Sequence, residues 1–261
     1  MSRNSLKSVC RLIQSIKEEI PIEKQFVEDL KRSIELNDKK ESRKPSQTYK
    51  PSSMNCLRNM YYQRIGIEPE SESNAVLIGI CESGTDRHET IQNYIRRMKY
   101  NNIDCEWINV GDYLREQNIT DPVVLEQKGN ETKLFSNIYN MRFMCDGLIK
   151  YKGEYYIIEI KTESTHKFNR HEEPWPSHIQ QATCYSMTIG VPKVIFIYEN
   201  RDTCNKKAYL VTVTDKMVER VVDIINRVNK AVQDNVIPPR CEDTHKCSYC
   251  KYKGQCKKDG I

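Results

Sequence analysis

DGLIKYKGEYYIIEIK, the stretch from Asp146 to Lys161, decides the predicted fold. Its alternating apolar residues predict two short strands joined by a turn at Lys152 and Gly153. In the second strand Glu159 and Lys161 share one face, because side chains alternate along a strand. A two-residue turn also places Asp146 directly opposite Glu159. Opposed residues have Cβ atoms about 4.5–5.5 Å apart, and like charges there are destabilising, so the pattern predicts a positive group between the two acids.

A divalent metal ion fits between two opposed carboxylates, because hard oxygen ligands suit Mg²⁺ or Mn²⁺. Lys161 points to the same side, where it could position a water or stabilise charge on a phosphate. The alternative is a solvated hairpin with cross-strand charges. The pattern E-x-K alone carries no weight, since segments 126–128 and 131–133 also match it. Segment 159–161 differs because it ends an apolar strand and has an aspartate on the neighbouring strand.

The composition is typical of a water-soluble globular protein. Of 261 residues, 38% are hydrophobic and 30% are charged, which predicts one domain with appendages. The net charge of +5 is a mild bias toward polyanionic partners. We see no signal peptide and no apolar run of membrane-spanning length. We therefore expect a cytoplasmic protein, and the usage rich in Lys, Asn and Ile indicates a bacterial cell or a phage-infected one.

The chain divides into three expected parts: an N-terminal helix and basic linker at 1–49, a core at 50–240, and a cysteine-rich tail at 241–261. The polar segment 37–53 is expected to be exposed. Expected helices are 3–38, 54–66, 83–99 (capped by Ser83 or Thr85), 177–190 and 215–234. Expected strands are 123–127, 142–150, 155–161, 193–200 and 207–213. This order predicts an α/β fold with a mixed central sheet.

Asp146 followed by Glu159-x-Lys161 resembles the signature of the PD-(D/E)xK nucleases. The proline that gives the signature its name is replaced here by Cys145, a departure that is common in that superfamily. The resemblance covers about residues 50 to 256. It implies a restriction-endonuclease-like core, with a mixed sheet flanked by helices, an N-terminal helical extension and a C-terminal cysteine-rich tail.

Two further motifs match the RecB-like branch of that superfamily. Gly84-x-x-x-His88 opens a predicted helix upstream of the strands, and His178-x-x-Gln181-x-x-x-Tyr185 lies on the predicted helix downstream. Gln181 and Tyr185 are four residues apart and so share a helix face. Alone, each motif is more often structural. Together with the hairpin acids, in this order, they make the resemblance strong.

The resemblance implies metal-dependent hydrolysis of DNA phosphodiester bonds. The metal, Mg²⁺ or Mn²⁺, would be held by His88, Asp146, Glu159 and the carbonyl of Ile160. The catalytic residues implied are Asp146, Glu159, Lys161, Gln181 and Tyr185. We expect an exonuclease acting on single-stranded DNA or DNA ends in recombination, repair or replication. A catalytically silent DNA-binding module and a structure-specific endonuclease are the alternatives, and any helicase partner would be a separate chain.

The cysteines give a second strong pattern. Eleven are present, and with no export signal metal or cluster ligation is favoured over disulfides. Cys247-x2-Cys250-x5-Cys256 can converge on one metal. Cys241 would complete a local set that suits zinc, whereas Cys56 lies far upstream. Spacing alone does not decide whether Cys241 or Cys56 is the fourth ligand.

RecB-like nucleases with an iron–sulfur cluster, including AddB and the CRISPR-associated adaptation exonucleases, resemble the layout that uses Cys56. In them one cysteine precedes the core, often followed by arginine and tyrosine, as Arg58, Tyr61 and Tyr62 follow here. The implied cofactor is a structural [4Fe–4S] cluster, with zinc as the alternative. Its ligands would be Cys56, Cys247, Cys250 and Cys256.

Basic side chains near the two ends of the predicted core are expected to form a track for DNA phosphates. They are Lys39, Lys40, Arg43, Lys44, Lys50, Lys246, Lys251, Lys253, Lys257 and Lys258. Tyr49, Tyr61 and Tyr62 lie nearby in sequence and are expected to stack bases of single-stranded DNA. For any one lysine a solvated charge remains the more common role.

Overall fold

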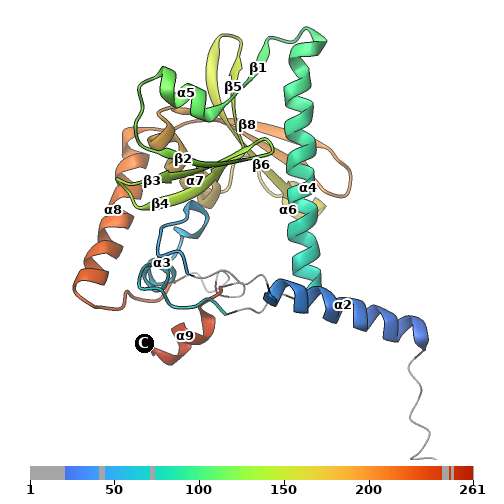
Figure 1. The fold of residues 1–261 in the computed structure, drawn as a ribbon, viewed down its shortest axis with the longest axis vertical. Helices are drawn as coiled ribbons and strands as arrows, with labels where there is room; N and C mark the ends of the chain where they lie inside the picture. The colour runs from blue at the N-terminus through green and yellow to red at the C-terminus, as the bar shows by residue number, and fades with distance from the viewer. Residues whose placement is uncertain (1–20, 41–44, 71–73, 243–246, 248–249, 261) are drawn as a thin grey trace, which may run out of the picture. The chain divides into compact units, whose positions relative to one another are not determined.

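The computed structural model describes residues 21–40, 45–70, 74–242, 247 and 250–260 (Figure 1). They fall into two compact units. The smaller unit holds helix α2 (Ile22–Lys40) and the first turns of helix α4 (Ala75–Arg97), where the N–H of Ala75 donates to Oε1 of Glu35 at 3.1 Å. The larger unit holds the remaining described elements and the residues of the candidate site.

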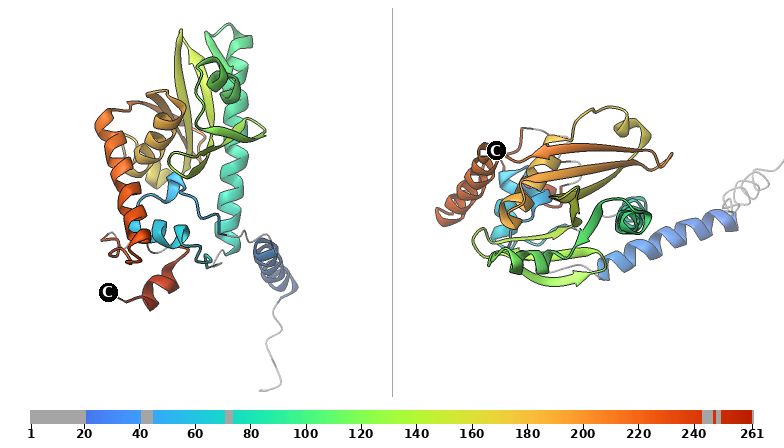
Figure 2. Two further views of the ribbon diagram at one scale, coloured as in Figure 1. Left: turned by 60° about the vertical axis from the view of Figure 1, so that its left-hand side comes forward. Right: turned by 90° about the horizontal axis from the view of Figure 1, so that it is seen from above.

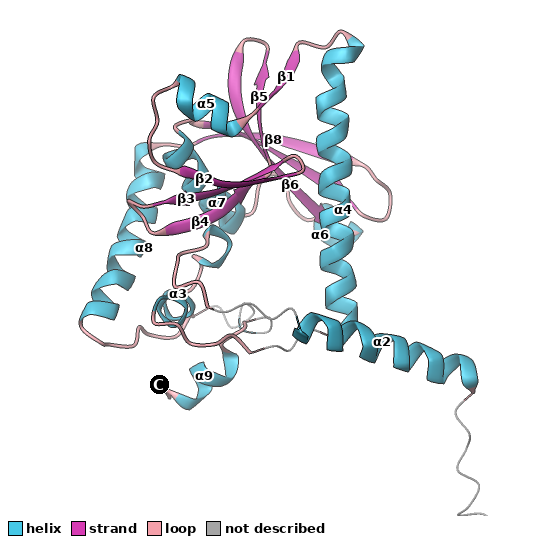
Figure 3. Cartoon of the chain, in the orientation of Figure 1, coloured by secondary structure: helices cyan, strands magenta, loops and turns pink. Residues whose placement is uncertain are grey.

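A five-stranded mixed sheet forms the centre of the larger unit (Figure 3). Its strand order is β1-β5-β6-β7-β8, and β6 and β7 are parallel whereas the other pairs are antiparallel. The strands are β1 (Cys105–Ile108), β5 (Gly147–Tyr151), β6 (Glu154–Glu163), β7 (Lys193–Asn200) and β8 (Lys206–Thr212). The predicted α/β fold with a mixed central sheet is therefore confirmed.

A second, antiparallel sheet precedes the β5–β6 hairpin in the chain. It has the order β2-β3-β4, with strands β2 (Val123–Lys128), β3 (Glu131–Ser136) and β4 (Met141–Cys145). Because β4 ends at Cys145 and β5 begins at Gly147, the chain passes from the small sheet to the large one at Asp146.

The β5–β6 hairpin has the predicted two-residue turn. Lys152 and Gly153 both have positive φ, 50° and 84°, as a type I′ turn requires. The ladder runs from Tyr151 opposite Glu154 back to Gly147 opposite Ile158. The predicted register is therefore confirmed, and Asp146 is the next position beyond the ladder.

Helices cover both faces of the central sheet (Figures 1 and 2). Besides α2, the described helices are α3 (Leu57–Arg64), α4, α5 (Val110–Glu116), α6 (Thr165–Phe168), α7 (Pro176–Ile189), α8 (Asp215–Gln233) and α9 (Lys253–Lys258), with 3-10 turns at Pro51–Ser53 and Met98–Asn101. On one face Ile91 of α4 packs with Ile158 and Ile160 of β6. On the other, Ile157 packs with Ala182 of α7 in the main core. Glu159 and Lys161 alternate with Ile158 and Ile160 and so face the α7 side.

Several expected boundaries change. The helix expected at 83–99 begins at Ala75, so Gly84 lies in its interior, and Thr85 donates to the carbonyl of Cys81 and does not cap. The tail contains the short helix α9 and is not wholly irregular. Of the helix expected at 3–38, the described residues contain α2, which begins at Ile22, and the first 20 residues lie outside the described ranges. No described helix combines the length and the apolar character needed for a membrane span.

Candidate active site

Asp146 is fixed where the chain leaves the small sheet and enters the large one. Its Oδ2 accepts a hydrogen bond from the backbone N–H of Ile160 at 2.8 Å, and its carbonyl accepts one from Nε2 of Gln92 at 2.7 Å. The residue is only 8% exposed. The bond to Ile160 holds the carboxylate against β6, next to Glu159. The carbonyl of Ile160 is the predicted backbone ligand, and Ile160 itself is fully buried.

His88 approaches Asp146 from α4. Its Nδ1 lies 3.6 Å from Oδ2 of Asp146. Gln92 lies one turn further along the same face of the helix, since residues four apart are neighbours. One helix face therefore supplies both the imidazole and the amide that holds the Asp146 backbone.

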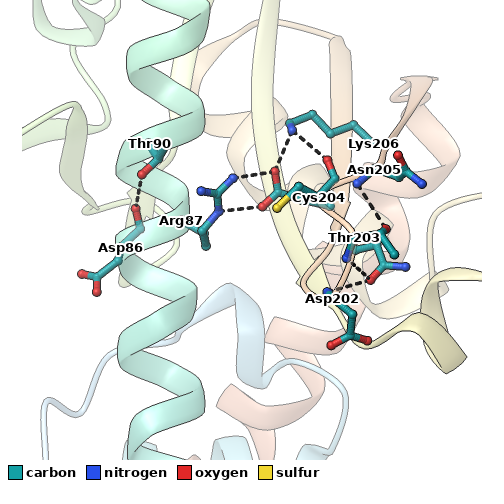
Figure 4. Close-up of polar contacts among 10 residues, drawn as sticks. Asp86, Arg87, Thr90, Asp202, Thr203, Cys204, Asn205 and Lys206 are labelled. Carbon is teal, nitrogen blue, oxygen red and sulfur yellow. Dashed lines mark hydrogen bonds and ion pairs between the residues drawn. The ribbon is translucent and has the colours of Figure 1, made fainter.

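The preceding residue, Arg87, anchors this part of α4 to the central sheet (Figure 4). Its guanidinium donates to both carboxylate oxygens of Glu199 on β7, at 2.7 and 2.9 Å, and Lys206 contacts the same carboxylate at 2.8 Å. Glu199 is fully buried. Because Arg87 is bonded in this two-point geometry, α4 cannot rotate freely about its axis, which fixes the direction in which His88 projects.

Glu159 is a buried carboxylate without a hydrogen bond. It is 1% exposed, and neither Oε1 nor Oε2 has a hydrogen-bond partner. Lys161 Nζ does lie 2.6 Å from Oε1, so the pair is in ionic contact without hydrogen-bond alignment. Leaving a buried acceptor unsatisfied costs about 1–3 kcal/mol, and more when it is charged. The carboxylates of Glu159 and Asp146 and the imidazole of His88 are ligand types that suit Mg²⁺ or Mn²⁺.

The two acids have pKa values displaced in opposite directions. Burial raises the pKa of Glu159 to about 7, with Asp146 adding to the effect and Lys161 opposing it. Burial acts in the same sense on Asp146, but His88 and Lys161 outweigh it and hold its pKa below the usual range. Burial would lower the pKa of His88, but the Asp146 carboxylate raises it overall. Such displaced carboxyl pairs are typical of functional sites.

Gln181 links the lysine to α7. Its Oε1 accepts a hydrogen bond from Lys161 Nζ at 3.3 Å, and its Nε2 donates to the Tyr185 hydroxyl at 2.6 Å. Tyr185 is 4% exposed and stacks on Phe143 with ring centroids 5.1 Å apart. The predicted pair therefore lies beside the acids, where Tyr185 orients Gln181. His178, the third residue of that motif, bonds through Nδ1 to the Tyr198 hydroxyl at 2.7 Å.

Glu131 is a neighbour of this site that sequence reasoning missed. Its Oε1 lies 3.9 Å from Nδ1 of His88. Within the described ranges, one group of three metal-ligand side chains has its donor atoms all within 4.8 Å of one another: His88, Glu131 and Asp146. The sequence signal is its place at the start of segment 131–133, one of several E-x-K matches in the chain. Only the pairing of β3 with β4 reveals its position.

Helix α3 connects the start of the core to the cysteine-rich tail. Cys56 occupies the position before its first turn. Arg58, which is 1% exposed, donates to Sγ of Cys256 at 3.5 Å, and Asn59 donates to Sγ of Cys250 at 3.6 Å. Two tail cysteines are thus held against the helix that follows Cys56.

The five candidate thiols act on one another electrostatically, but among the described residues no three of their sulfur atoms lie within 4.8 Å of one another. Burial raises the pKa of Cys56, and the thiols of Cys241 and Cys250 raise it further. Burial also raises the pKa of Cys247, with contributions from Cys250, Cys241 and Cys256. Of the other cysteines, Cys105, Cys145 and Cys184 are buried, Cys81 and Cys204 are exposed, and Cys10 lies outside the described residues.

The predicted track for DNA phosphates is described only in part. The exposed members are Lys50, Lys251, Lys253, Lys257 and Lys258. The side chains of Lys39, Lys40, Arg43, Lys44 and Lys246 lie outside the described part of the chain. The phosphate track therefore stays a prediction.

The predicted stacking role of the three tyrosines is wrong. Tyr49, Tyr61 and Tyr62 are 1%, 3% and 2% exposed and belong to the main core. The Tyr49 hydroxyl donates to Oδ1 of Asn229 on α8 at 2.7 Å, and its backbone N–H donates to the carbonyl of Asn140. This part of the expected exposed loop is therefore packed inside the protein, and none of the three rings is available to a base.

No protein-family model matches this chain, and no curated protein matches it. Solved structures with a partial likeness include SSO0001, which is 17% identical with a TM-score of 0.49 over 91% of this chain and 98% of that one. Another is LHK-Exo in complex with dAMP, 16% identical with a TM-score of 0.46 over 72% and 89% of the two chains. A third is the alkaline exonuclease LHK-Exo from Laribacter hongkongensis, 14% identical with a TM-score of 0.44 over 73% and 90%. At these values the likeness carries no assignment of individual residues.

Proposed function

We propose that this protein is a metal-dependent deoxyribonuclease, an exonuclease acting on single-stranded DNA or DNA ends. The observation that carries the proposal is a set of buried acids with basic partners: His88 lies 3.6 Å from Asp146, and Lys161 lies 2.6 Å from Glu159, a carboxylate that is 1% exposed. Charges are buried in this way when a cation pairs with them. The PD-(D/E)xK resemblance supplies the class of reaction, phosphodiester hydrolysis.

The chain's own residues have separable roles in this proposal. Asp146, Glu159, His88 and the Ile160 carbonyl hold the divalent ion, which when bound polarises a phosphate and lowers the pKa of a water. Lys161 lies 2.6 Å from Glu159, where its ammonium can orient that water and stabilise charge on the phosphate. Gln181 holds Lys161 in place through its 3.3 Å hydrogen bond, and Tyr185 in turn holds Gln181.

We propose a structural role for the cysteines. A [4Fe–4S] cluster held by Cys56, Cys247, Cys250 and Cys256 would tie the tail to the helix that begins the core. The bonds from Arg58 and Asn59 to two of these sulfurs support this arrangement, because hydrogen bonds to thiolates are a common feature of cluster sites. Zinc remains the alternative, with Cys241 as a local ligand.

The test is a nuclease assay on anaerobically purified protein. End-labelled single- and double-stranded DNA is incubated with Mg²⁺ or Mn²⁺, beside Asp146→Asn and, as a matched control, the exposed Asp112→Asn. Stepwise shortening by the wild type and by Asp112→Asn, absent in Asp146→Asn and with EDTA, supports the exonuclease. Cleavage of substrate with blocked ends shows an endonuclease instead. Equal DNA binding by all three proteins with no cleavage shows a silent binding module.

The cellular setting is also a proposal. We place the reaction in recombination, repair or replication in the cytoplasm of a bacterial or phage-infected cell. A helicase or other motor that opens the duplex would be a separate chain. Copurification of the untagged protein with a motor from its own source would test this setting.

A further inference from the structure

Asp146 lies outside the hydrogen-bonded ladders of both sheets. Strand β4 ends at Cys145 and β5 begins at Gly147, and the registers of both strands leave Asp146 without a partner. Sheet pairing therefore does not fix the peptide that joins Asp146 to Gly147. The carbonyl of this peptide accepts the 2.7 Å hydrogen bond from Gln92, which is 2% exposed. Its other end, at Gly147, has a different support.

The indole of Trp107 packs directly on Gly147. In the pairing of β1 with β5, Trp107 lies opposite Ile149, so Gly147 is its diagonal neighbour and is within reach of an aromatic ring. A Cβ atom added to Gly147 would lie 2.8 Å from Cζ2 of the indole and 3.0 Å from Cζ3. Because carbon atoms pack at about 3.5–4.0 Å, no side chain larger than hydrogen fits at residue 147 beneath this ring.

Space for the indole, and not backbone conformation, explains the glycine at this position. Gly147 is buried and does not have the positive φ that glycine adopts more readily than other residues. Glycine weakens a strand, and where it occurs in one it often marks the close approach of another group. Here that group is Trp107, so the strand accepts a weaker residue next to Asp146 in exchange for contact with the ring.

The indole is itself held by the apolar cluster between α4 and the central sheet. Trp107 packs on this cluster, whose buried members come from α4 and from strands β1, β5 and β6. Ile91 is one of the members on α4, and Gln92 is the next residue of that helix. The amide and the cluster that supports the indole therefore both involve α4, the helix that carries His88.

We propose that Trp107 is a positioning residue: packed on Gly147, its indole fixes the peptide that follows Asp146 and with it the direction of the Asp146 carboxylate. The inference rests on the proposed nuclease function. A misplacement of about 1 Å at a reacting group costs on the order of 10²-fold in rate. Trp107 acts through Asp146 and touches neither DNA nor the reacting atoms, so its loss lowers kcat and leaves the KM for DNA unchanged.

The experiment measures kcat, KM and Tm for the full, anaerobically purified chain, with end-labelled single-stranded DNA and Mn²⁺. Gly147→Ala forces the indole away from the strand, Trp107→Leu removes it, and the double variant makes room for the added methyl group. Gly79→Ala is the matched glycine control, because nothing lies within 4 Å of a Cβ atom added there. Tyr151→Leu is the matched aromatic control, since Tyr151 packs on the same cluster from the other end of β5.

We expect kcat to fall by about 10²-fold in Gly147→Ala and by about tenfold in Trp107→Leu, with KM unchanged in both. The double variant should be faster than either single variant, and both controls should keep the wild-type kcat. Such a recovery is the result that a general loss of packing would not give, because two independent packing losses add.

A wild-type kcat in Trp107→Leu overturns the proposal, even if Gly147→Ala does not fold. A double variant that regains the Tm of the wild type but stays as slow as Gly147→Ala also overturns it, because the indole would then stabilise the fold without positioning Asp146. In both cases cleavage by the wild type keeps the nuclease proposal standing. Absence of cleavage by the wild type removes the nuclease proposal and this inference with it.

Discussion

Lys161 Nζ lies 2.6 Å from Glu159 Oε1, yet neither oxygen of that buried carboxylate takes part in a hydrogen bond. An ion pair this close normally includes at least one aligned N–H···O bond. Lys161 also donates to Gln181. The lysine therefore contacts both the acid and Gln181, and the second carboxylate oxygen of Glu159 retains capacity to bind a cation.

The first prediction is that Mn²⁺ stabilises the protein through Glu159. At a concentration of one hundred times Kd, a ligand of the native state adds about 2.7 kcal/mol to the free energy of unfolding. For a chain of this size that corresponds to a Tm increase on the order of 5–10 °C. Glu159→Gln should abolish the increase with Mn²⁺, because it removes the charge of a proposed metal ligand. The control is Glu154→Gln on the same strand, whose carboxylate is 54% exposed. A full Mn²⁺-dependent increase in Glu159→Gln would contradict the assignment.

The second prediction separates Lys161 from metal binding. Lys161→Met keeps the length of the side chain and removes its charge, so DNA cleavage under single-turnover conditions should slow by about 10²–10³-fold. The Mn²⁺-dependent increase in Tm should remain. Lys133→Met is the matched control, because Lys133 belongs to the similar segment 131–133 and its side chain is 35% exposed. Equal slowing in both variants would show that the effect is a general loss of DNA attraction.

Local pattern predicted much of the central sheet. The alternation in 155–161 and the turn at Lys152 and Gly153 set the register of the hairpin, because a two-residue turn leaves little freedom in pairing. Asp146, Glu159 and Lys161 could therefore be placed together from sequence. Their proximity depends only on the pairing of two strands that are neighbours in the sequence.

Glu131 could not be placed in this way, since its position opposite Asp146 depends on the pairing of β3 with β4 and on the fastening of Asn130 to α4. The prediction that the three tyrosines are exposed is wrong for a related reason. Tyr49 is buried because α8, far along the chain, packs on it through Asn229. An amphipathic side chain in a basic segment gives no sign of such a partner, so its expected exposure was wrong.

The third prediction concerns the anchor of α4 (Figure 4). Arg87→Ala leaves Glu199 buried with Lys206 as its remaining basic partner. Breaking a fully buried pair costs about 3–5 kcal/mol. Because Arg87 is 30% exposed and Lys206 remains, we expect a loss of about 1–3 kcal/mol in the free energy of unfolding. Cleavage should also fall, since His88 is the next residue. The double variant Arg87→Ala with Glu199→Gln should lose less than the sum of the two single losses, and strict additivity would argue against a direct coupling.

The fourth prediction identifies the metal at the cysteines. Replacing Cys56, Cys247, Cys250 or Cys256 singly by serine should remove most of the bound iron and sulfide and lower the Tm, because the tail loses its tie to α3. Cys81 and Cys204 are exposed, so Cys81→Ser and Cys204→Ser are the controls and should keep both the bound iron and the sulfide. Cys241→Ser distinguishes the two ligand sets by metal analysis. Retained iron supports the set with Cys56, whereas bound zinc that disappears in Cys241→Ser supports the local set.

The fifth prediction is a dependence of stability on pH that comes from His178. Burial lowers the pKa of this imidazole to about 3, with nearby Lys161 adding to the effect, and its Nδ1 lies 2.7 Å from the Tyr198 hydroxyl. The neutral ring can accept a hydrogen bond from the hydroxyl group, whereas both nitrogens of the imidazolium can only donate.

In the unfolded chain a histidine titrates near pH 6.5. Between that pH and about 3 the unfolded state therefore binds one proton more than the native state. Stability is complete above about pH 6.5 and falls as the pH decreases through this window. His178→Gln should have a smaller difference in Tm between about pH 7 and about pH 5 than the wild type has. The exposed His166→Gln is the matched control and should keep the wild-type profile. If His178→Gln also keeps that profile, the loss of stability in acid comes from other groups.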